Sequence, residues 1–326
     1  MGLFCDVAEH GGAYWESLES EEYYVMNVFF DAVIFFYLIA IGAFIIELVT
    51  SWKEVTQKRI RACLGILFFF SWLVIFYGSF VEPKFLRVTE EKIFLSQEPT
   101  QTIDLLVIGD FHVGPYRKSA WIEKVVQEAN TLSPDVIVLV GDYIYNHSSQ
   151  MKENNALALL EAPLGVHAIT GNHDYIDQHL EMIVDFLQQA GIQVLENTSV
   201  NLSLNDKNVT LAGMSDLWFD GDLEETLEGV TPEETVILLS HNPDVVLDLQ
   251  YKQVDLVISG HTHGGQIRLP WIGSVAKIPD LLGRTYDLGL FDYKGLPLFI
   301  TGGVGETGPR ARLFNPPEMN LLHVSF

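Results

Sequence analysis

The chain has 326 residues, of which 48% are hydrophobic, and carries a formal net charge of -24. This length allows one large domain or a domain with an appendage. Because so acidic a surface repels nucleic-acid phosphates, the composition excludes nucleic acid as an expected partner. A phosphate-bearing substrate would need bound cations to draw it in. The two cysteines, Cys5 and Cys63, lie outside the long C-terminal part, so no disulfide framework is expected there.

Two apolar helices are expected first along the chain. Ala62–Phe80 contains no charged residue, and as a helix it would span about 28 Å, close to the thickness of a bilayer core. Val25–Val49 is also apolar but carries Asp31 and Glu47 near its ends. For Asp31 an interfacial position is expected rather than a functional intramembrane carboxylate. Both segments are predicted to insert into the cell membrane, which makes the lipid bilayer an expected partner.

Positive charges beside these helices indicate their orientation. The loop between them carries four Lys or Arg residues, against three shortly after the second helix and none before the first. The positive-inside rule therefore favours a cytoplasmic loop and an extracytoplasmic C-terminal domain, with the cytoplasmic face as the alternative. The expected organisation is an acidic N-terminal segment (1–24), a membrane anchor with two transmembrane helices (25–81), a linker (82–101) and a C-terminal domain (102–326).

In the C-terminal domain, apolar β-rich runs alternate with helical stretches. Runs that are apolar throughout indicate strands buried on both faces between helix layers, so the expected fold class is α/β. The expected strands are Ile103–Ile108, Val136–Val140, Val166–Thr170, Val236–Leu239 and Val254–Ile258. The expected helices are Ala120–Leu132, Asn155–Glu161, Ile176–Ala190 and Pro243–Leu249. Arg284–Phe291 and Leu296–Thr301 predict a hairpin around "DYKG", and Asn320–Phe326 predicts a last strand.

Each of the five expected strands ends in residues of metal-ligand type. The motifs are GDFH (Asp110, His112), GD (Asp142), GNHD (Asn172, His173, Asp174), SHN (His241) and GHTH (His261, His263). Loops after the carboxyl ends of strands in an open α/β sheet converge on one crevice, so the five motifs are expected to meet. A single such motif is more often a turn or a hydrogen-bonded core histidine. Five of them in order favour a metal centre.

The ligand types narrow the choice of metal. Carboxylate, imidazole and amide ligands suit Mn, Fe or Zn, and neither an all-oxygen calcium cage nor a thiolate cluster. The set exceeds the needs of one ion, whereas two divalent metal ions sharing Asp142 would use all of it. A pair about 3.5–4 Å apart is the arrangement that hydrolyses phosphate esters, because it neutralises the phosphate and generates hydroxide near neutral pH.

In this order the motifs resemble those of the calcineurin-like metallophosphoesterase family, over about residues 102–326. The last motif, "GHTHGGQ", is similar to that of a bacterial membrane-associated branch that includes UDP-2,3-diacylglucosamine pyrophosphatase. The resemblance implies a metallophosphoesterase domain built as a four-layer α/β/β/α sandwich. It implies one metal on Asp110, His112, Asp142 and His263, and a second on Asp142, Asn172, His241 and His261.

The same resemblance gives His173 a catalytic role at the phosphate or the leaving oxygen, with Asp174 expected to orient its ring. Family members that act on phosphoproteins carry Arg-Gly shortly after Gly-Asp, and "GDYIYNHS" has no arginine, which disfavours such a substrate. A substrate-binding arginine is expected instead from Arg310 or Arg312, or from Arg117, with an ordinary surface or salt-bridge role as the alternative for each.

Two features stay open. His147 follows the Gly-Asp motif and could reach substrate, and Trp218, Phe219 and "LPWIGSVAKIPDLL" place apolar residues on expected loops. These loops either pack onto the domain or form an apolar rim for a lipid chain or the membrane surface. The pattern predicts a membrane-anchored phosphoesterase for a lipid phosphate, phosphodiester or lipid-linked nucleotide diphosphate such as UDP-2,3-diacylglucosamine. The alternatives are a phosphodiesterase for soluble substrates and an inactive membrane scaffold.

Overall fold

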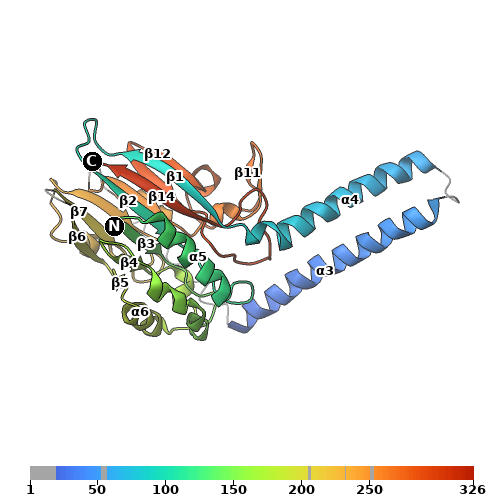
Figure 1. Cartoon of the computed structure of the whole chain (residues 1–326), viewed down its shortest axis with the longest axis horizontal. Helices are drawn as coiled ribbons and strands as arrows, with labels where there is room; N and C mark the ends of the chain where they lie inside the picture. Colours follow the sequence, from blue (N-terminus) through green and yellow to red (C-terminus); the bar gives the residue numbers. More distant parts are fainter. Residues whose placement is uncertain (1–19, 53–56, 205–206, 232, 250–252) are drawn as a thin grey trace.

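Two long helices leave one side of a two-sheet domain and run next to each other (Figure 1). They are α3 (Ser20–Thr50) and α4 (Lys58–Phe80), and a short 3-10 turn, η3 (Glu82–Lys84), follows α4. The computed structural model describes residues 20–52, 57–204, 207–231, 233–249 and 253–326. Most of the acidic segment predicted at residues 1–24 lies outside these described residues.

Both helices have the length and composition of membrane spans. The apolar stretches Val25–Thr50 and Lys58–Lys84 cover 26 and 27 residues. That is about 40 Å of helix, against a hydrocarbon core of about 30 Å. Nearly all of their described side chains lie outside any protein core, unlike those of a core helix in a soluble protein. The prediction of two apolar helices is confirmed, and both are candidate membrane spans.

Polar contacts join the two helices halfway along their length. The hydroxyl of Tyr37 lies 2.6 Å from the hydroxyl of Ser71, and the indole of Trp72 donates a hydrogen bond of 2.9 Å to the carbonyl of Leu38. The helices are antiparallel neighbours, so the first turns of α3 and the last turns of α4 both lie at the domain (Figure 1).

The domain contains two six-stranded sheets. The first has the order β1-β14-β2-β3-β4-β5 and the second β12-β13-β9-β8-β7-β6. Strands β2 to β5 are parallel, as are β7, β8, β9 and β13, so their carboxyl ends lie along one edge of each sheet. The first sheet consists of β1 (Arg87–Phe94), β2 (Thr102–Ile108), β3 (Val136–Val140), β4 (Val166–Ile169), β5 (Gln193–Val194) and β14 (Glu318–Ser325). The second consists of β6 (Thr198–Leu204), β7 (Lys207–Gly213), β8 (Thr235–Leu239), β9 (Leu256–Ser259), β12 (Gly289–Tyr293) and β13 (Leu296–Ile300).

Alternation along the strands builds three apolar layers. In β2, Leu106 faces the helices that cover the first sheet, and Leu105 packs between the two sheets. In β9, Ile258 packs between the sheets, and Val257 faces the outer layer of the second sheet. The first sheet is covered by α5 (Ser119–Leu132), η4 (Ser148–Leu159) and α6 (Leu180–Gln189), and the second by α7 (Leu223–Thr226) and η6 (Pro243–Leu247). The predicted four-layer α/β/β/α sandwich is confirmed.

Several strands lie outside the predicted set. The stretch expected as a linker, residues 82–101, contains β1, an edge strand whose sequence RVTEEKIF is largely polar. The strands β6 and β7 are also additional, because their polar alternation leaves no continuous apolar run. Edge strands and half-exposed strands carry fewer apolar residues than central ones, so hydropathy alone passes over them.

Some expected helices differ in type or bounds. The helix expected at Asn155–Glu161 is the 3-10 segment η4, and the one expected from Ile176 starts at Leu180, after the 3-10 turn η5 (Asn172–Tyr175). The predicted hairpin is shorter than expected, because η8 (Gly283–Tyr286) precedes β12. A small second hairpin, β10 (Arg268–Leu269) with β11 (Gly273–Ser274), occupies the loop after the turn η7 (His263–Gly265).

Candidate metal centre

Seven side chains of metal-ligand type gather beyond the carboxyl ends of five strands. They are Asp110 and His112 after β2, Asp142 after β3, Asn172 after β4, His241 after β8, and His261 and His263 after β9. All seven are buried. The structure therefore brings together all five strand-end motifs that the sequence predicts.

The backbone at these strand ends is strained. Asp110, His112, Asp142, His261 and His263 have φ angles of 51°, 42°, 57°, 68° and 51°, in the left-handed region that residues other than glycine rarely adopt. Each such conformation costs on the order of 1–3 kcal/mol and persists only where the surrounding structure holds it, which is typical of functional sites. The strain turns these side chains inward towards one another.

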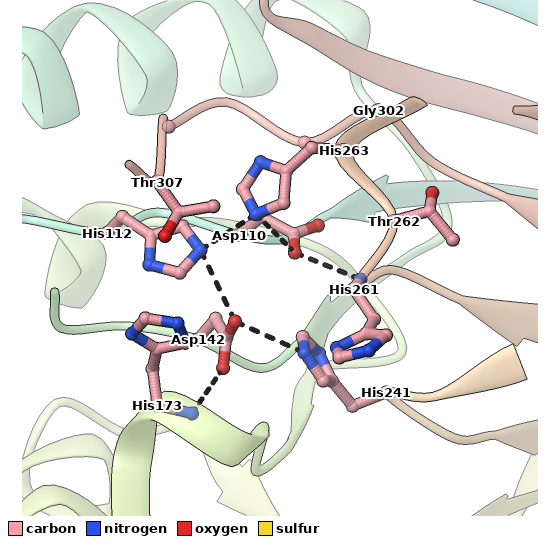
Figure 2. A network of polar contacts seen from close by, with 12 residues as sticks. Asp110, His112, Asp142, His173, His241, His261, Thr262, His263, Gly302 and Thr307 are labelled. Atoms are coloured by element: carbon pink, nitrogen blue, oxygen red, sulfur yellow. Dashed lines mark hydrogen bonds and ion pairs between the residues drawn. The ribbon is translucent and has the colours of Figure 1, made fainter. Parts of the chain in front are cut away.

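Four of these residues form one tight cluster. One ligand atom each of Asp110, His112, Asp142 and His263 lies within 4.8 Å of the others. His263 Nε2 is 3.4 Å from Asp110 Oδ1, and His112 Nε2 is 3.3 Å from Asp142 Oδ2 (Figure 2). The Nε2 atoms of His112 and His263 are 2.9 Å apart. Two imidazoles and two carboxylates thus converge on one buried point.

A second group lies on the other side of Asp142. His241 Nε2 is 3.2 Å from Asp142 Oδ2, the same oxygen that faces His112 (Figure 2). His261 Nδ1 lies 2.9 Å from Asn172 Oδ1, and the rings of His241 and His261 are 5.2 Å apart. The carbonyl of Val140 accepts a hydrogen bond of 2.6 Å from His241 Nδ1, which turns the Nε2 atom of that ring towards Asp142. Asp142 therefore stands between two groups of ligand atoms.

The lack of hydrogen-bond partners at several of these buried atoms fits the binding of cations. Among the described side chains, five buried atoms of the centre have no hydrogen-bond partner: Asp110 Oδ2, His112 Nδ1, His241 Nε2, His261 Nε2 and His263 Nδ1. A buried polar atom left without a partner is costly, and two buried carboxylates repel each other. A divalent cation bound by carboxylate oxygens and imidazole nitrogens removes both costs.

The charges of the centre are strongly coupled. Burial raises the pKa of Asp110 to about 6, and the neighbouring Asp142 adds to that increase. For Asp142 burial also raises the pKa, but His241, His173 and His112 hold it well below its usual range. Burial lowers the pKa of His241, and Asp142 and Asp110 together raise it to about 10. The two carboxylates thus favour a positive charge at this point of the centre.

His173 and Asp174 form hydrogen bonds with other partners than the expected pairing with each other. The carbonyl of Tyr145 accepts a hydrogen bond of 2.5 Å from His173 Nδ1, so proton exchange at this ring falls to Nε2. The Asp174 carboxylate instead accepts the backbone N–H groups of Gly171, Asp142 and Tyr143. The expectation that Asp174 orients the His173 ring is therefore corrected, because Asp174 holds the backbone that presents Asp142.

His173 itself lies beside the candidate metal ligands. Its backbone N–H donates a hydrogen bond of 2.8 Å to Asp142 Oδ1 (Figure 2), and its ring lies 4.5 Å from that of His112. Burial lowers the pKa of His173 to about 4, with Asp142 opposing and His112 adding to the decrease. The ring is thus neutral at pH 7 in the protein alone, with its proton on Nδ1.

Arg312 has a structural position rather than the expected one at a substrate. It is fully buried, and its guanidinium donates to the carbonyls of Gly302, Gly303, Gly305 and Asn315 at 2.6–3.2 Å. Each nitrogen of the planar guanidinium therefore donates to a carbonyl of the loop after β13. This arginine holds the glycine-rich loop in place next to the centre.

The other two arginines are also engaged. Arg310 Nη2 lies 3.0 Å from Asp31 Oδ2 of α3, and its guanidinium stacks on Tyr116. Arg117 pairs with Glu306 at 3.0 Å and is buried. Both residues therefore join the anchor or the surrounding loops, which is the salt-bridge alternative. Asp31 of α3 thus pairs with an arginine of the C-terminal domain.

His147, Trp218 and Phe219, which the sequence left open, take up capping and packing roles. His147 is exposed, and its Nδ1 accepts the backbone N–H of Ser149 at the start of η4. The indole of Trp218 meets the ring of His261 edge to face at 4.7 Å, and Phe219 stacks on Tyr175 at 4.5 Å. This loop thus packs against a candidate ligand.

Two residues near the centre are absent from the predicted set. Asp216 is buried after β7, and burial raises its pKa to about 7 even though the nearby His241 lowers it. A recognised strand at "NVTLAG" would have made "MSD" a sixth strand-end motif. Asn27 of α3 accepts a hydrogen bond of 2.7 Å from the hydroxyl of Tyr145, the residue that holds His173. No local pattern in the sequence connects Asn27 to the centre.

Known proteins are similar in sequence to this chain. A family model described as "Calcineurin-like phosphoesterase" matches residues 103–265. An uncharacterized metallophosphoesterase of Aquifex aeolicus is 33% identical over 258 residues, 76% of this chain and 94% of the relative. The UDP-2,3-diacylglucosamine pyrophosphatase LpxG of Chlamydia muridarum is 28% identical over 76% of this chain and 91% of the relative. A transmembrane protein with metallophosphoesterase domain of Danio rerio is 29% identical over 69% of this chain, which spans 54% of that relative's length.

Proposed function

The chain belongs to the calcineurin-like phosphoesterase family, and from that premise we propose that it hydrolyses a lipid-linked phosphate compound at a membrane surface, using two divalent metal ions. The phosphoester hydrolase activity follows from the family. The observation that carries the proposal is the buried cluster of Asp110, His112, Asp142 and His263. Such a cluster has no evident use in a catalytically inactive scaffold.

The two groups of ligand atoms define the proposed metal sites. The first ion would bind Asp110, His112, Asp142 and His263, and the second would bind Asp142 together with Asn172, His241 and His261. Support for a bridging Asp142 comes from its Oδ2, which faces His112 at 3.3 Å and His241 at 3.2 Å. When bound, such a pair neutralises the phosphate and supplies hydroxide near neutral pH. The mixed ligands favour Mn, Fe or Zn.

His173 is proposed to move the proton. Its Nδ1 proton is held by the carbonyl of Tyr145, so Nε2 exchanges protons with the substrate. A phosphate dianion beside the ring favours the imidazolium, since a nearby opposite charge stabilises the charged form. Nε2–H then donates to the leaving oxygen as the ester bond breaks. Asp174 is proposed to act on the backbone of Asp142 and not on this ring.

The position of the centre supports a lipid-linked substrate. Tyr145, which holds His173, contacts Asn27 in the first turns of α3, and Arg310 pairs with Asp31 one turn further along. Because Val25–Thr50 is a candidate membrane span, this contact supports a position of the active-site loops at the bilayer surface. The similarity to UDP-2,3-diacylglucosamine pyrophosphatase LpxG makes a lipid-linked diphosphate the first compound to test. The charges around the two helices favour a multi-pass protein of the cell membrane with this domain outside.

Metal analysis with a substrate panel tests the proposal. Purified full-length protein should contain up to two transition-metal ions per chain and hydrolyse UDP-2,3-diacylglucosamine in vesicles faster than p-nitrophenyl phosphate. Asp142→Asn should lose metal and activity, whereas the exposed-site control Asp185→Asn on α6 should keep both. Full metal content in Asp142→Asn would remove its bridging role. Preference for soluble bis-p-nitrophenyl phosphate would favour the alternative of a soluble substrate.

A further inference from the structure

The hairpin of β10 and β11 carries an exposed apolar surface, which we call the hairpin patch. Its members are Leu269, Trp271, Ile272, Val275 and Leu281, together with Phe314. Trp271 is 103% exposed relative to its reference, and Ile272, Leu281 and Phe314 are each more than 60% exposed. Two other large exposed apolar side chains of the described domain, Leu159 and Met182, stand on separate elements. Several exposed apolar side chains on one hairpin and on the segments paired with it mark an interaction site.

The backbone of the hairpin presents this tryptophan outward. Trp271 has a φ of 65°, a left-handed conformation that is strained for a bulky side chain, and it lies between β10 and β11. Glycine or asparagine would occupy that turn position without strain. The strained backbone conformation persists at this exposed tip although no described residue packs on the indole ring.

The hairpin patch is structurally continuous with the membrane helices. Ile267 forms an isolated β-bridge with Leu313, and the backbone N–H of Arg268 donates a hydrogen bond of 2.9 Å to the Leu313 carbonyl. On its other side, this segment lies against α4. The backbone N–H of Arg312 donates a hydrogen bond of 2.8 Å to the carbonyl of Gly78, and a Cβ added at Gly78 would lie 3.7 Å from Leu313 Cβ. The strand β11 accordingly lies at the side of the domain from which α4 leaves (Figure 1).

The polar residues around the hairpin patch suit lipid headgroups. Lys277 and Arg284 are exposed beside it, in a chain whose net charge is -24. Basic side chains next to an apolar tip match the phosphate layer above the acyl chains, and tryptophan prefers that same depth.

From these observations we propose that the β10–β11 hairpin inserts Trp271 and Ile272 into the bilayer interface, as a third membrane contact beside α3 and α4. The proposal rests on the anchoring part of the proposed function. Its consequence is orientation: three contacts fix the tilt of the domain, whereas two helices alone leave it free to rock. The loop from His263 to β10 is short, so this contact also fixes the centre relative to the lipid surface.

Fluorescence from single cysteines tests this contact on the full chain. Three single-cysteine proteins are made, each with Cys5→Ser. The first keeps the native Cys63 of α4 as its labelling site. The other two carry Cys63→Ser together with either Ile272→Cys or Met182→Cys. Each protein is labelled with an environment-sensitive nitrobenzoxadiazole and reconstituted in phosphatidylcholine–phosphatidylglycerol vesicles. Brominated acyl chains should quench labels at Cys63 and Ile272→Cys and leave Met182→Cys, on exposed α6, unquenched.

The outcomes separate this inference from the anchoring proposal. Quenching at Cys63 without quenching at Ile272→Cys overturns the hairpin contact and leaves the anchor standing. An unquenched Cys63 overturns the anchor itself. A blue-shifted but unquenched label at residue 272 assigns the hairpin patch to protein contact, including a second copy of the chain, and also overturns the proposal.

A second readout measures the consequence of the contact. Trp271→Ser combined with Ile272→Ser should lower hydrolysis of a vesicle-held substrate by about tenfold, the ratio given by losing about 1.4 kcal/mol of interfacial binding. Hydrolysis of soluble bis-p-nitrophenyl phosphate should not change. Equal losses on both substrates would show a damaged centre instead and would overturn the orienting role.

Discussion

Tyr145 joins Asn27 of the first apolar helix to the centre of the enzyme. Its hydroxyl donates a hydrogen bond of 2.7 Å to the Asn27 side chain, and its carbonyl accepts one of 2.5 Å from His173. The two partners lie 146 residues apart in the chain, so a residue of a candidate membrane span takes part in positioning the proposed proton donor. The first apolar helix therefore contributes to the wall of the centre.

Removing this contact should slow the reaction without removing metal. Asn27→Leu takes away the oxygen that Tyr145 donates to, and we expect kcat to fall about tenfold, which corresponds to about 1.4 kcal/mol of lost positioning. Metal content should stay at the wild-type value. Asn27→Asp keeps an acceptor and should recover part of the rate, and Val28→Leu on the exposed face serves as the control. An unchanged kcat in Asn27→Leu would show that α3 does not position His173.

The proposed proton transfer predicts a dependence on the leaving group. His173→Asn should keep its metals and lose about 10²–10⁴ in rate on substrates with alkoxide leaving groups, the typical contribution of a general acid. The loss should be smaller on p-nitrophenyl esters, whose leaving group scarcely needs a proton. Rates on both substrates, measured with metal content, check this. Equal losses would assign His173 to phosphate binding, and wild-type rates would remove it from the mechanism.

Arg312 should matter for stability rather than for substrate affinity. Arg312→Lys loses the planar fork that meets four carbonyls, and each hydrogen bond from a charged group contributes about 1.5–3 kcal/mol. We expect a loss of at least about 3 kcal/mol, seen as a lower Tm, with KM unchanged in the folded fraction. Arg310→Lys, at a half-exposed ion pair, should change Tm much less. A raised KM with an unchanged Tm would restore the substrate-binding role of Arg312.

One carboxyl outside the centre makes the stability depend on pH. Burial raises the pKa of Asp280 to about 7, and the neighbouring Asp244 adds to the increase. A raised pKa means that the folded protein keeps a proton that the unfolded chain loses. The contribution of Asp280 to the free energy of unfolding is therefore complete below about pH 4 and is lost as the pH rises to 7.

Replacing this carboxyl should thus help only at higher pH. Asp280→Asn keeps an oxygen that can accept the Gly283 N–H, and it should raise Tm at pH 8 but have little effect at pH 4. Thermal unfolding of the full chain in detergent at the two pH values measures this. The exposed-site change Asp185→Asn should show no such difference. A Tm gain in Asp280→Asn that is equal at both pH values would contradict the shifted pKa.

Hydropathy and strand-end motifs determine much of this protein from sequence alone. The two apolar helices follow from apolar runs long enough to cross a bilayer, because few other structures tolerate such sequences. The centre follows from five motifs placed after apolar strands, since parallel strands deliver their carboxyl ends to one edge. Asp110, His112, Asp142, His241, Asn172, His261 and His263 all meet there as predicted.

Tertiary structure alone decides the roles that depend on distant partners. Arg312 and Arg310 carry the same charge two residues apart, yet one is closed in by carbonyls and the other pairs with Asp31, 279 residues away. Asp174 likewise binds backbone amides of a neighbouring loop in place of the adjacent histidine. A local pattern reports residue type and periodicity, whereas these contacts depend on which chain segments pack together. Polar edge strands such as β1 escape the same analysis, because pairing with β14 and not hydropathy makes them strands.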